Sequence, residues 1–287
     1  MLKDEIDSLA PGRDFNRRSF VQTTVGSGFA AAVLPVTAQT ITTDSAGLEV
    51  GSVNIPVGDF QMPAYRAAPA GKKNLPVVLV ACEIFGVHEH IADVCRRLAR
   101  QGYLAIAPEL FARHGNAGAY TDIPKLISEV VAKAADAQVN GDLDATVAWA
   151  AAHGGDTARL AITGFCWGGR TVWSYAAHNA KLNAAVAWYG PVARNYHAGD
   201  QTVIERAASI KAPVLGLYGA ADGGIPVETL TQLEAALKAA GNTRCEFVVY
   251  PDTPHGFYAD YRPSYRPAAA EGGWKRCLAW FKKHGVA

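Results

Sequence analysis

Short apolar runs alternate with amphipathic segments along most of the chain. Nearly continuous apolar runs, the pattern of strands covered on both faces, occupy residues 76–82, 103–107, 159–163, 184–189, 213–218 and 244–250. Between them, helix-compatible segments with recurring apolar positions predict helices near 91–98, 123–134, 139–152, 170–178, 230–237 and 274–281. Residues 47–56 and 60–67 alternate polar and apolar positions, which predicts an antiparallel hairpin at a sheet edge. The whole pattern predicts an α/β fold: a mostly parallel central sheet with helices on both faces.

Composition narrows the classes of function. The chain has 287 residues, 49% of them hydrophobic, enough for one sizeable core, and we expect a single domain over residues 39–287. The formal net charge of +1 gives no reason to expect a nucleic acid partner. The five cysteines show no C-x-x-C spacing and the eight histidines no H-x-x-x-H pair, so we predict neither a metal site nor a cofactor. We interpret the H-E-H sequence at 88–90 as the solvated start of a helix.

The first 38 residues have the pattern of a targeting segment. The sequence R-R-S-F-V at 17–21 precedes a weakly apolar run to residue 36, and Ala38 follows. This resembles a twin-arginine export signal cleaved after Ala38, which predicts a periplasmic or secreted enzyme. The alternatives are a membrane anchor and an unstructured tail on a cytoplasmic protein. The run is too rich in small and polar residues to span a bilayer comfortably, so we expect no membrane span in the processed chain.

A glycine-rich strand-to-helix turn contains one nucleophile. The apolar run ends at Gly164, Cys166 follows two residues later, and Gly168 and Gly169 precede a helix-compatible segment. This spacing is typical of a nucleophile elbow, in which small neighbours make room for a strained turn. The amide groups and the dipole of the following helix favour the thiolate. The alternative is a buried structural cysteine in a βα turn.

Two later residues fit the partners of this nucleophile. Asp222 and His255 each follow a predicted strand near its carboxyl end, where ligands bind in open α/β sheets. Their order, nucleophile then acid then histidine, is the one that α/β-hydrolases use. Asp222 could instead be a turn residue and His255 an ordinary loop histidine, and His197 is the rival base.

Four segments together resemble the dienelactone hydrolase family. They are G-F-C-W-G-G at 164–169, E-I-F-G at 83–86, P-E-L-F-A-R at 108–113 and H-G-F at 255–257. The resemblance implies an α/β-hydrolase fold and hydrolysis of a carboxylic ester or lactone without a cofactor. It also implies roles for five residues: Cys166 as nucleophile, Asp222 as the orienting acid, His255 as base, Glu83 beside the thiol, and Arg113 on a substrate carboxylate.

One position departs from the family pattern. The second carboxylate-binding arginine of the family falls on Ala259, and Arg262 is the nearest replacement. We expect the backbone N–H groups of Ile84 and Trp167 to form the oxyanion hole.

The pocket and its ligand follow from the same resemblance. We expect Tyr189 and Phe257 to line the pocket, and the substrate to be a small ester or lactone that carries a carboxylate, such as a dienelactone. The alternatives are a broader exported esterase or thioesterase, and a non-catalytic ligand-binding protein on the same scaffold.

Overall fold

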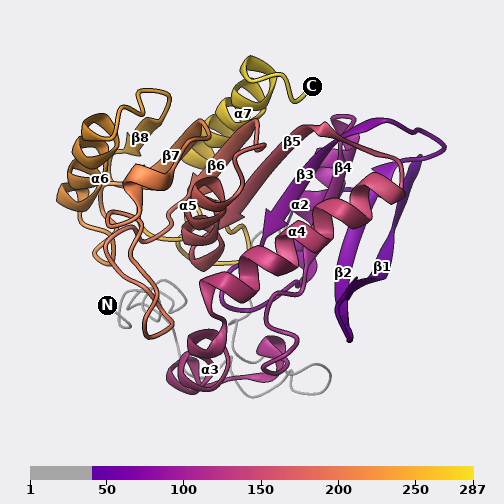
Figure 1. Cartoon of the computed structure of the whole chain (residues 1–287), viewed down its shortest axis with the longest axis horizontal. Helices are drawn as coiled ribbons and strands as arrows, with labels where there is room; N and C mark the ends of the chain where they lie inside the picture. The colour runs from indigo at the N-terminus through magenta and orange to yellow at the C-terminus, as the bar shows by residue number, and fades with distance from the viewer. Residues whose placement is uncertain (1–40) are drawn as a thin grey trace, which may run out of the picture.

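A computed structural model describes residues 41–287, whose centre is an eight-stranded sheet (Figure 1). The strand order is β1-β2-β4-β3-β5-β6-β7-β8. The predicted hairpin at the sheet edge is confirmed: β1 pairs antiparallel with β2, and β2 pairs antiparallel with β4. The remaining pairs are parallel. The predicted export signal and its cleavage site lie outside the described residues.

The strands coincide with the apolar runs of the sequence. Their bounds are β1 Leu48–Val57, β2 Phe60–Pro69, β3 Leu75–Ala81, β4 Leu104–Pro108, β5 Gly155–Phe165, β6 Ala184–Trp188, β7 Val214–Gly219 and β8 Glu246–Tyr250. Strands β3, β4, β6 and β7 are buried along almost their whole length, as continuous apolar runs require.

Helices cover both faces of the sheet, which confirms the predicted α/β class. Helices α4 and α5 lie in front of the sheet in Figure 1, and α2 and α7 lie behind it. The helix bounds are α2 Glu89–Arg100, α3 Ile123–Glu129, α4 Asp136–Ala152, α5 Trp167–His178, α6 Val227–Ala239 and α7 Pro267–Lys283. Three single turns of 3-10 helix are η2 Ala117–Ala119, η3 Val131–Lys133 and η4 Ala207–Ser209. Within residues 41–287, no helix combines the length and the apolar character needed to cross a bilayer.

Two details of the sequence-based prediction were wrong. The helix expected over 123–134 ends at Glu129, because the backbone breaks at Val130 and lets Val130 and the adjacent Val131 both reach the core. The H-E-H segment is not solvated throughout. His90 is only 3% exposed, because the loop before α7 covers the start of α2 and Asp260 of that loop bonds the imidazole.

The sheet topology brings four loops together. Strands β3, β5, β6, β7 and β8 run parallel, so their carboxyl ends lie at one edge of the sheet. The loops that follow β3, β5, β7 and β8 carry Glu83, Cys166, Asp222 and His255 respectively. Residues that are far apart in the sequence thus meet at the carboxyl ends of the strands, where open α/β sheets bind their ligands.

Candidate active site

Cys166 occupies the tip of the turn between β5 and α5. Its backbone has φ 54° and ψ −116°, a conformation that residues other than glycine rarely adopt. The Cys166 amide donates to the Trp188 carbonyl at 3.0 Å, and the Cys166 carbonyl accepts from the Arg170 amide at 3.1 Å. The first bond ties the turn to β6 and the second begins the helix. The thiol-bearing residue is 1% exposed.

The glycines around Cys166 are required by close backbone contacts. A Cβ on Gly164 would lie 2.4 Å from the Gly168 carbonyl oxygen. A Cβ on Gly168 would lie 2.3 Å from the oxygen of Ala81, at the end of β3. A Cβ on Gly169 would meet the Trp188 carbonyl at 2.5 Å. Strand and helix therefore approach as closely as the elbow pattern predicted.

Asp222 and His255 lie in contact. Asp222 Oδ2 accepts a hydrogen bond from His255 Nδ1 at 2.7 Å, and each residue is 4% exposed. Two backbone contacts hold their loops together: the Ala221 amide donates to the Thr253 carbonyl at 3.0 Å, and Gly219 packs directly against the same carbonyl. Since Nδ1 is bonded to the carboxylate, it carries the proton and Nε2 is the acceptor nitrogen. Within the described residues Nε2 has no hydrogen-bond partner.

The rival histidine has a different environment. His197 lies in the loop after β6, with a third of its side chain exposed, and its Nδ1 is 3.6 Å from Asp200 of the same loop.

Glu83 follows β3 and is completely buried. Its Oε2 accepts a short hydrogen bond from the hydroxyl of Tyr261, and its Oε1 lies 3.1 Å from Arg262 Nη2. Arg262 is 2% exposed. Burial opposes the charge of Arg262, but the electrostatic attraction of Glu83 first, and of the neighbouring Tyr261 and Cys166 groups after it, outweighs burial and raises the guanidinium pKa. This places a buried cation beside the candidate nucleophile, while Ala259 is fully buried and carries no charge.

The two residues expected to line the pocket are both buried, in different ways. The ring of Tyr189 meets His255 edge-on at 5.1 Å, and its hydroxyl has no partner within residues 41–287. Burial, together with the negative charge of Glu83, raises the pKa of Tyr189 well above its ordinary value. Phe257 packs behind Tyr189 at 5.2 Å and against Trp188 at 6.1 Å. Tyr189 therefore faces the site, and Phe257 supports it from the core.

The two residues proposed for the oxyanion hole follow two neighbouring strands, β3 and β5. Trp167 is the first residue of α5, where an amide has no acceptor within its own helix. Ile84 lies in the turn after β3, which is closed by a bond from the Gly86 amide to the Glu83 carbonyl at 3.3 Å. Both residues are buried.

Arg113 makes its described contacts away from the thiol. Its Nη2 pairs with Asp142 of α4 at 2.6 Å, and its guanidinium lies 4.3 Å from the centre of the Phe60 ring. The same loop reaches the site through Phe111, whose ring packs on Trp167 at 4.5 Å.

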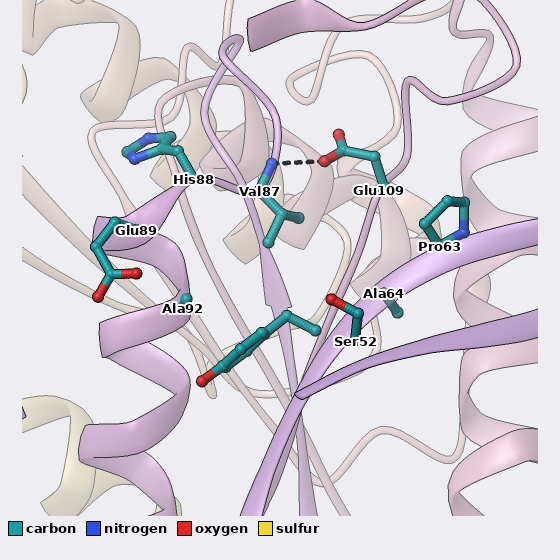
Figure 2. A pocket seen from close by; sticks show the side chains of 9 residues that line it. Ser52, Pro63, Ala64, Val87, His88, Glu89, Ala92 and Glu109 are labelled. Atoms are coloured by element: carbon teal, nitrogen blue, oxygen red, sulfur yellow. Dashed lines mark hydrogen bonds between the residues drawn. The ribbon is translucent and has the colours of Figure 1, made fainter. Parts of the chain in front are cut away.

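A cavity of about 290 Å³ opens beside the loop that follows Glu83 (Figure 2). Glu109 Oε2 accepts from the Val87 amide at 2.8 Å on one side of it, and burial raises the pKa of the Glu109 carboxyl. The lining residues are Ser52, Pro63, Ala64, Tyr65, Val87, His88, Glu89, Ala92 and Glu109. None of Cys166, Asp222 and His255 lines this cavity, so it is separate from the candidate triad.

The described part of the chain contains cysteines and other side chains that can ligate a metal ion. All five cysteines lie in that part and none forms a disulfide. Within residues 41–287, no group of three or more His, Cys, Asp or Glu side chains is arranged to hold a metal ion.

Sequence reasoning missed Tyr261. The signal that could have found it is the dense polar segment D-Y-R at 260–262, a few residues after His255.

Comparison with known proteins places the chain in a family. A profile of the Dienelactone hydrolase family matches residues 62–285. The chain belongs to the dienelactone hydrolase family. Among dienelactone hydrolase relatives, the Methylorubrum extorquens protein named "Putative carboxymethylenebutenolidase" is 55% identical over 286 residues, covering 99% of this chain and 98% of its own length. An Escherichia coli K12 protein of the same name is 51% identical over 270 residues, covering 92% of this chain and 97% of its own.

A solved structure agrees with this assignment to the dienelactone hydrolases. The "Putative Dienelactone Hydrolase" of Klebsiella pneumoniae superposes with a TM-score of 0.80 at 53% identity, over 82% of this chain and 98% of that one. The expected family, the α/β-hydrolase fold and the assignment as a carboxylic ester hydrolase are thereby confirmed.

Proposed function

We propose that the chain hydrolyses a carboxylic ester or lactone through a Cys166–His255–Asp222 triad and a covalent thioester. The observation that carries the proposal is the pairing of His255 with Asp222 through Nδ1, which leaves Nε2 as the proton acceptor at the edge of the sheet that carries Cys166. A thiol becomes a strong nucleophile as thiolate. An imidazole held by a buried carboxylate is suited to remove its proton and to stabilise the imidazolium that results.

The proposed reaction has two halves. The Cys166 sulfur attacks the carbonyl carbon, a C–S bond forms, and the oxyanion accepts hydrogen bonds from the Ile84 and Trp167 amides. The C–O bond then breaks, and His255 returns its proton to the leaving oxygen. In the second half, His255 takes a proton from water as the hydroxide attacks the thioester carbonyl. The C–S bond then breaks, the acid is released, and His255 returns the proton to the departing sulfur.

A carboxylate-bearing substrate is supported by the buried cation in the site. Arg262 would take the role of the arginine that the family has at the position of Ala259, and a substrate carboxylate would pair with its guanidinium. Because Arg262 also pairs with Glu83 at 3.1 Å, such a substrate would compete with Glu83 for the cation and change the contacts of that carboxylate. Dienelactones, the substrates that the relatives' names indicate, carry such a group.

A second candidate is a broader esterase for uncharged acyl or aryl esters. Its support is that Arg113, expected on a substrate carboxylate, is paired with Asp142 instead. Parallel kcat/KM values on a dienelactone and on p-nitrophenyl acetate separate the two. The first candidate requires kcat/KM on the dienelactone to be higher by at least about tenfold. This is the ratio expected from one extra hydrogen bond to a charged group.

The covalent step is tested with variants of the triad. Cys166→Ala should abolish turnover of both substrates, and His255→Gln should lose turnover as well, because the base acts in both halves of the reaction. Acid quenching of the wild type during turnover should trap an acyl adduct that intact-protein mass spectrometry detects at the mass of the acyl group. His197→Gln is the matched control and should retain normal turnover. Full activity in Cys166→Ala would remove the proposal.

A further inference from the structure

Tyr261 contacts Glu83, a group of the candidate site that lies outside the proposed triad. It lies in the segment between β8 and α7, six residues after His255, and is 7% exposed. Its hydroxyl bonds Glu83 Oε2 across 178 positions of the sequence. The Tyr261 hydroxyl also accepts a hydrogen bond from Arg262 Nε at 3.2 Å.

The chemistry of these three groups fixes the direction of each hydrogen bond. Arginine nitrogens can only donate, so the hydroxyl oxygen of Tyr261 accepts from Arg262. Its single proton is then available to Glu83, which accepts as a carboxylate. Burial raises the pKa of Tyr261 well above its ordinary value, and the charge of Glu83 adds to that effect, so the hydroxyl keeps the proton that it donates.

The ring of Tyr261 is fixed from the side of α2. His88 meets it edge-on with 4.9 Å between ring centres, and the His90 ring lies 5.3 Å away. His90 in turn bonds Asp260 through Nδ1 at 2.9 Å. The hydroxyl is therefore held in one place by aromatic packing that does not involve the triad.

We propose that Tyr261 is a positioning residue: by donating to Oε2 it fixes Glu83 as a carboxylate beside Cys166, and it acts on the thiol only through Glu83. This inference rests on the proposed role of Cys166 as nucleophile. The titratable and charged groups that surround the Tyr261–Glu83 pair include Cys82, Cys166, Arg262, Tyr189, His88 and His90.

The test compares Tyr261→Phe with Tyr258→Phe in the full chain. Tyr258 is a buried neighbour whose hydroxyl accepts from Arg97 Nη1 at 3.2 Å, so its variant loses a buried hydroxyl of the same segment without losing a contact to Glu83. The readouts are the pH profile of kcat/KM on p-nitrophenyl acetate and the pH profile of Cys166 alkylation by iodoacetamide. A carboxylate that loses a charge-assisted donor protonates at higher pH. We expect the acid limb of both profiles to move up by about one pH unit in Tyr261→Phe and to stay in place in Tyr258→Phe.

A double variant separates positioning from a general structural effect. In the background of Glu83→Gln, adding Tyr261→Phe should leave the pH profiles unchanged, because the carboxylate through which Tyr261 acts is absent. An equal shift in that background, an unshifted acid limb in Tyr261→Phe, or an equal shift in Tyr258→Phe would each overturn the proposal.

Two further measurements keep the outcome clear. Thermal unfolding verifies that each variant is folded. If Tyr261→Phe does not unfold cooperatively, Tyr261→Met, which also removes the hydroxyl, replaces it. Cys166→Ala is run in parallel: residual turnover there would refute the triad itself, whereas an inactive Cys166→Ala with an unshifted Tyr261→Phe would refute only the positioning role.

Discussion

Cys166 has a backbone conformation that costs about 1–3 kcal/mol when a residue other than glycine adopts it. The surrounding contacts impose it: the turn is bonded to β6 through the Trp188 carbonyl, and glycines on either side allow β5 and α5 to approach. The strained backbone of Cys166 is thus held in place by contacts that the neighbouring glycines make possible. This makes the glycines of the turn as important to the site as the thiol.

Gly168→Ala tests this dependence. The added Cβ would lie 2.3 Å from the Ala81 oxygen and 2.5 Å from the Cys82 oxygen, and backbone atoms cannot move aside cheaply. We expect a loss of more than about 3 kcal/mol of unfolding free energy, measured by urea denaturation. Gly141→Ala is the control: Gly141 is exposed in α4 with nothing within 4 Å of its Cβ position, and that variant should gain about 0.5–1 kcal/mol. Equal stability of the two variants would show that the elbow tolerates a side chain.

The sequence predicted the residues of the site unequally. Cys166, Asp222 and His255 were found because each follows a strand that its own apolar pattern reveals. Tyr261 was missed because its contact with Glu83 spans 178 positions, and the polar D-Y-R segment at 260–262 does not by itself show which residue it meets. Arg113 was expected at the substrate from the resemblance alone, and sequence could not reveal that Asp142 of α4 pairs with it.

At the scale of elements, Asp260 joins α2 to the segment before α7. Its carboxylate accepts from His90 at 2.9 Å and from Arg97 Nη2 at 2.8 Å, and the residue is 2% exposed. Burial alone would raise the Asp260 pKa, but the hydrogen bonds and charges of His90 and Arg97 outweigh burial and lower it. Two elements separated by most of the chain are therefore joined by one ionised group.

Asp260→Asn should destabilise the protein by about 2 kcal/mol at neutral pH, because it removes the buried carboxylate that His90 and Arg97 share and leaves Asp93 as the remaining buried counter-charge of Arg97. A carboxyl whose pKa is lowered on folding stabilises the native state above its unfolded pKa of about 3.9, and that stabilisation is lost as the pH falls through the folded value. The difference between wild type and variant should therefore shrink in urea unfolding series below about pH 4.

A second His–Asp pair provides the control for this prediction. Asp144 and His178 are 2.7 Å apart, but their side chains are 47% and 41% exposed. Asp144→Asn should cost less than about 1 kcal/mol, since solvent screens an exposed pair. A cost as small as this for Asp260→Asn would mean that the buried pair does not hold the elements together.

The elements themselves were largely predictable, and the exceptions have physical causes. Apolar periodicity located the strands, the hairpin and most of the helices, because local burial determines both the pattern and the structure. The break at Val130 and the burial of His90 depend on which other segment covers each of them. Tertiary packing determines which segment buries each of these residues, and the local sequence does not reveal it.

Across the whole molecule, the five cysteines lie in very different environments. Burial raises the pKa of Cys82, Cys95 and Cys277 far above the ordinary thiol value, and that of Cys245 to about 11. A thiol reacts with alkylating reagents as thiolate, so these four should be inert in the folded protein near neutral pH. Cys166, at the elbow, is the expected exception.

Native labelling with iodoacetamide followed by mass spectrometry measures this difference. We expect one adduct, mapped to Cys166, in the native protein and five adducts in concentrated guanidinium chloride. Cys166→Ala should give no native adduct. Labelling of Cys245 should appear as the pH approaches about 11, where its thiolate becomes populated. A native adduct on Cys82 near neutral pH would contradict the burial described here.

The contact between the Asp222 and His255 loops also has a consequence during synthesis. A ribosome that has just completed the elbow has made the cysteine, but the imidazole is still 89 codons away, and the segment bearing Tyr261 comes later still. Prematurely terminated chains therefore carry an unassisted sulfur atom. On the proposed mechanism the assisted thiol exists only once the chain extends past His255, so copies that stop earlier lack the hydrolase activity.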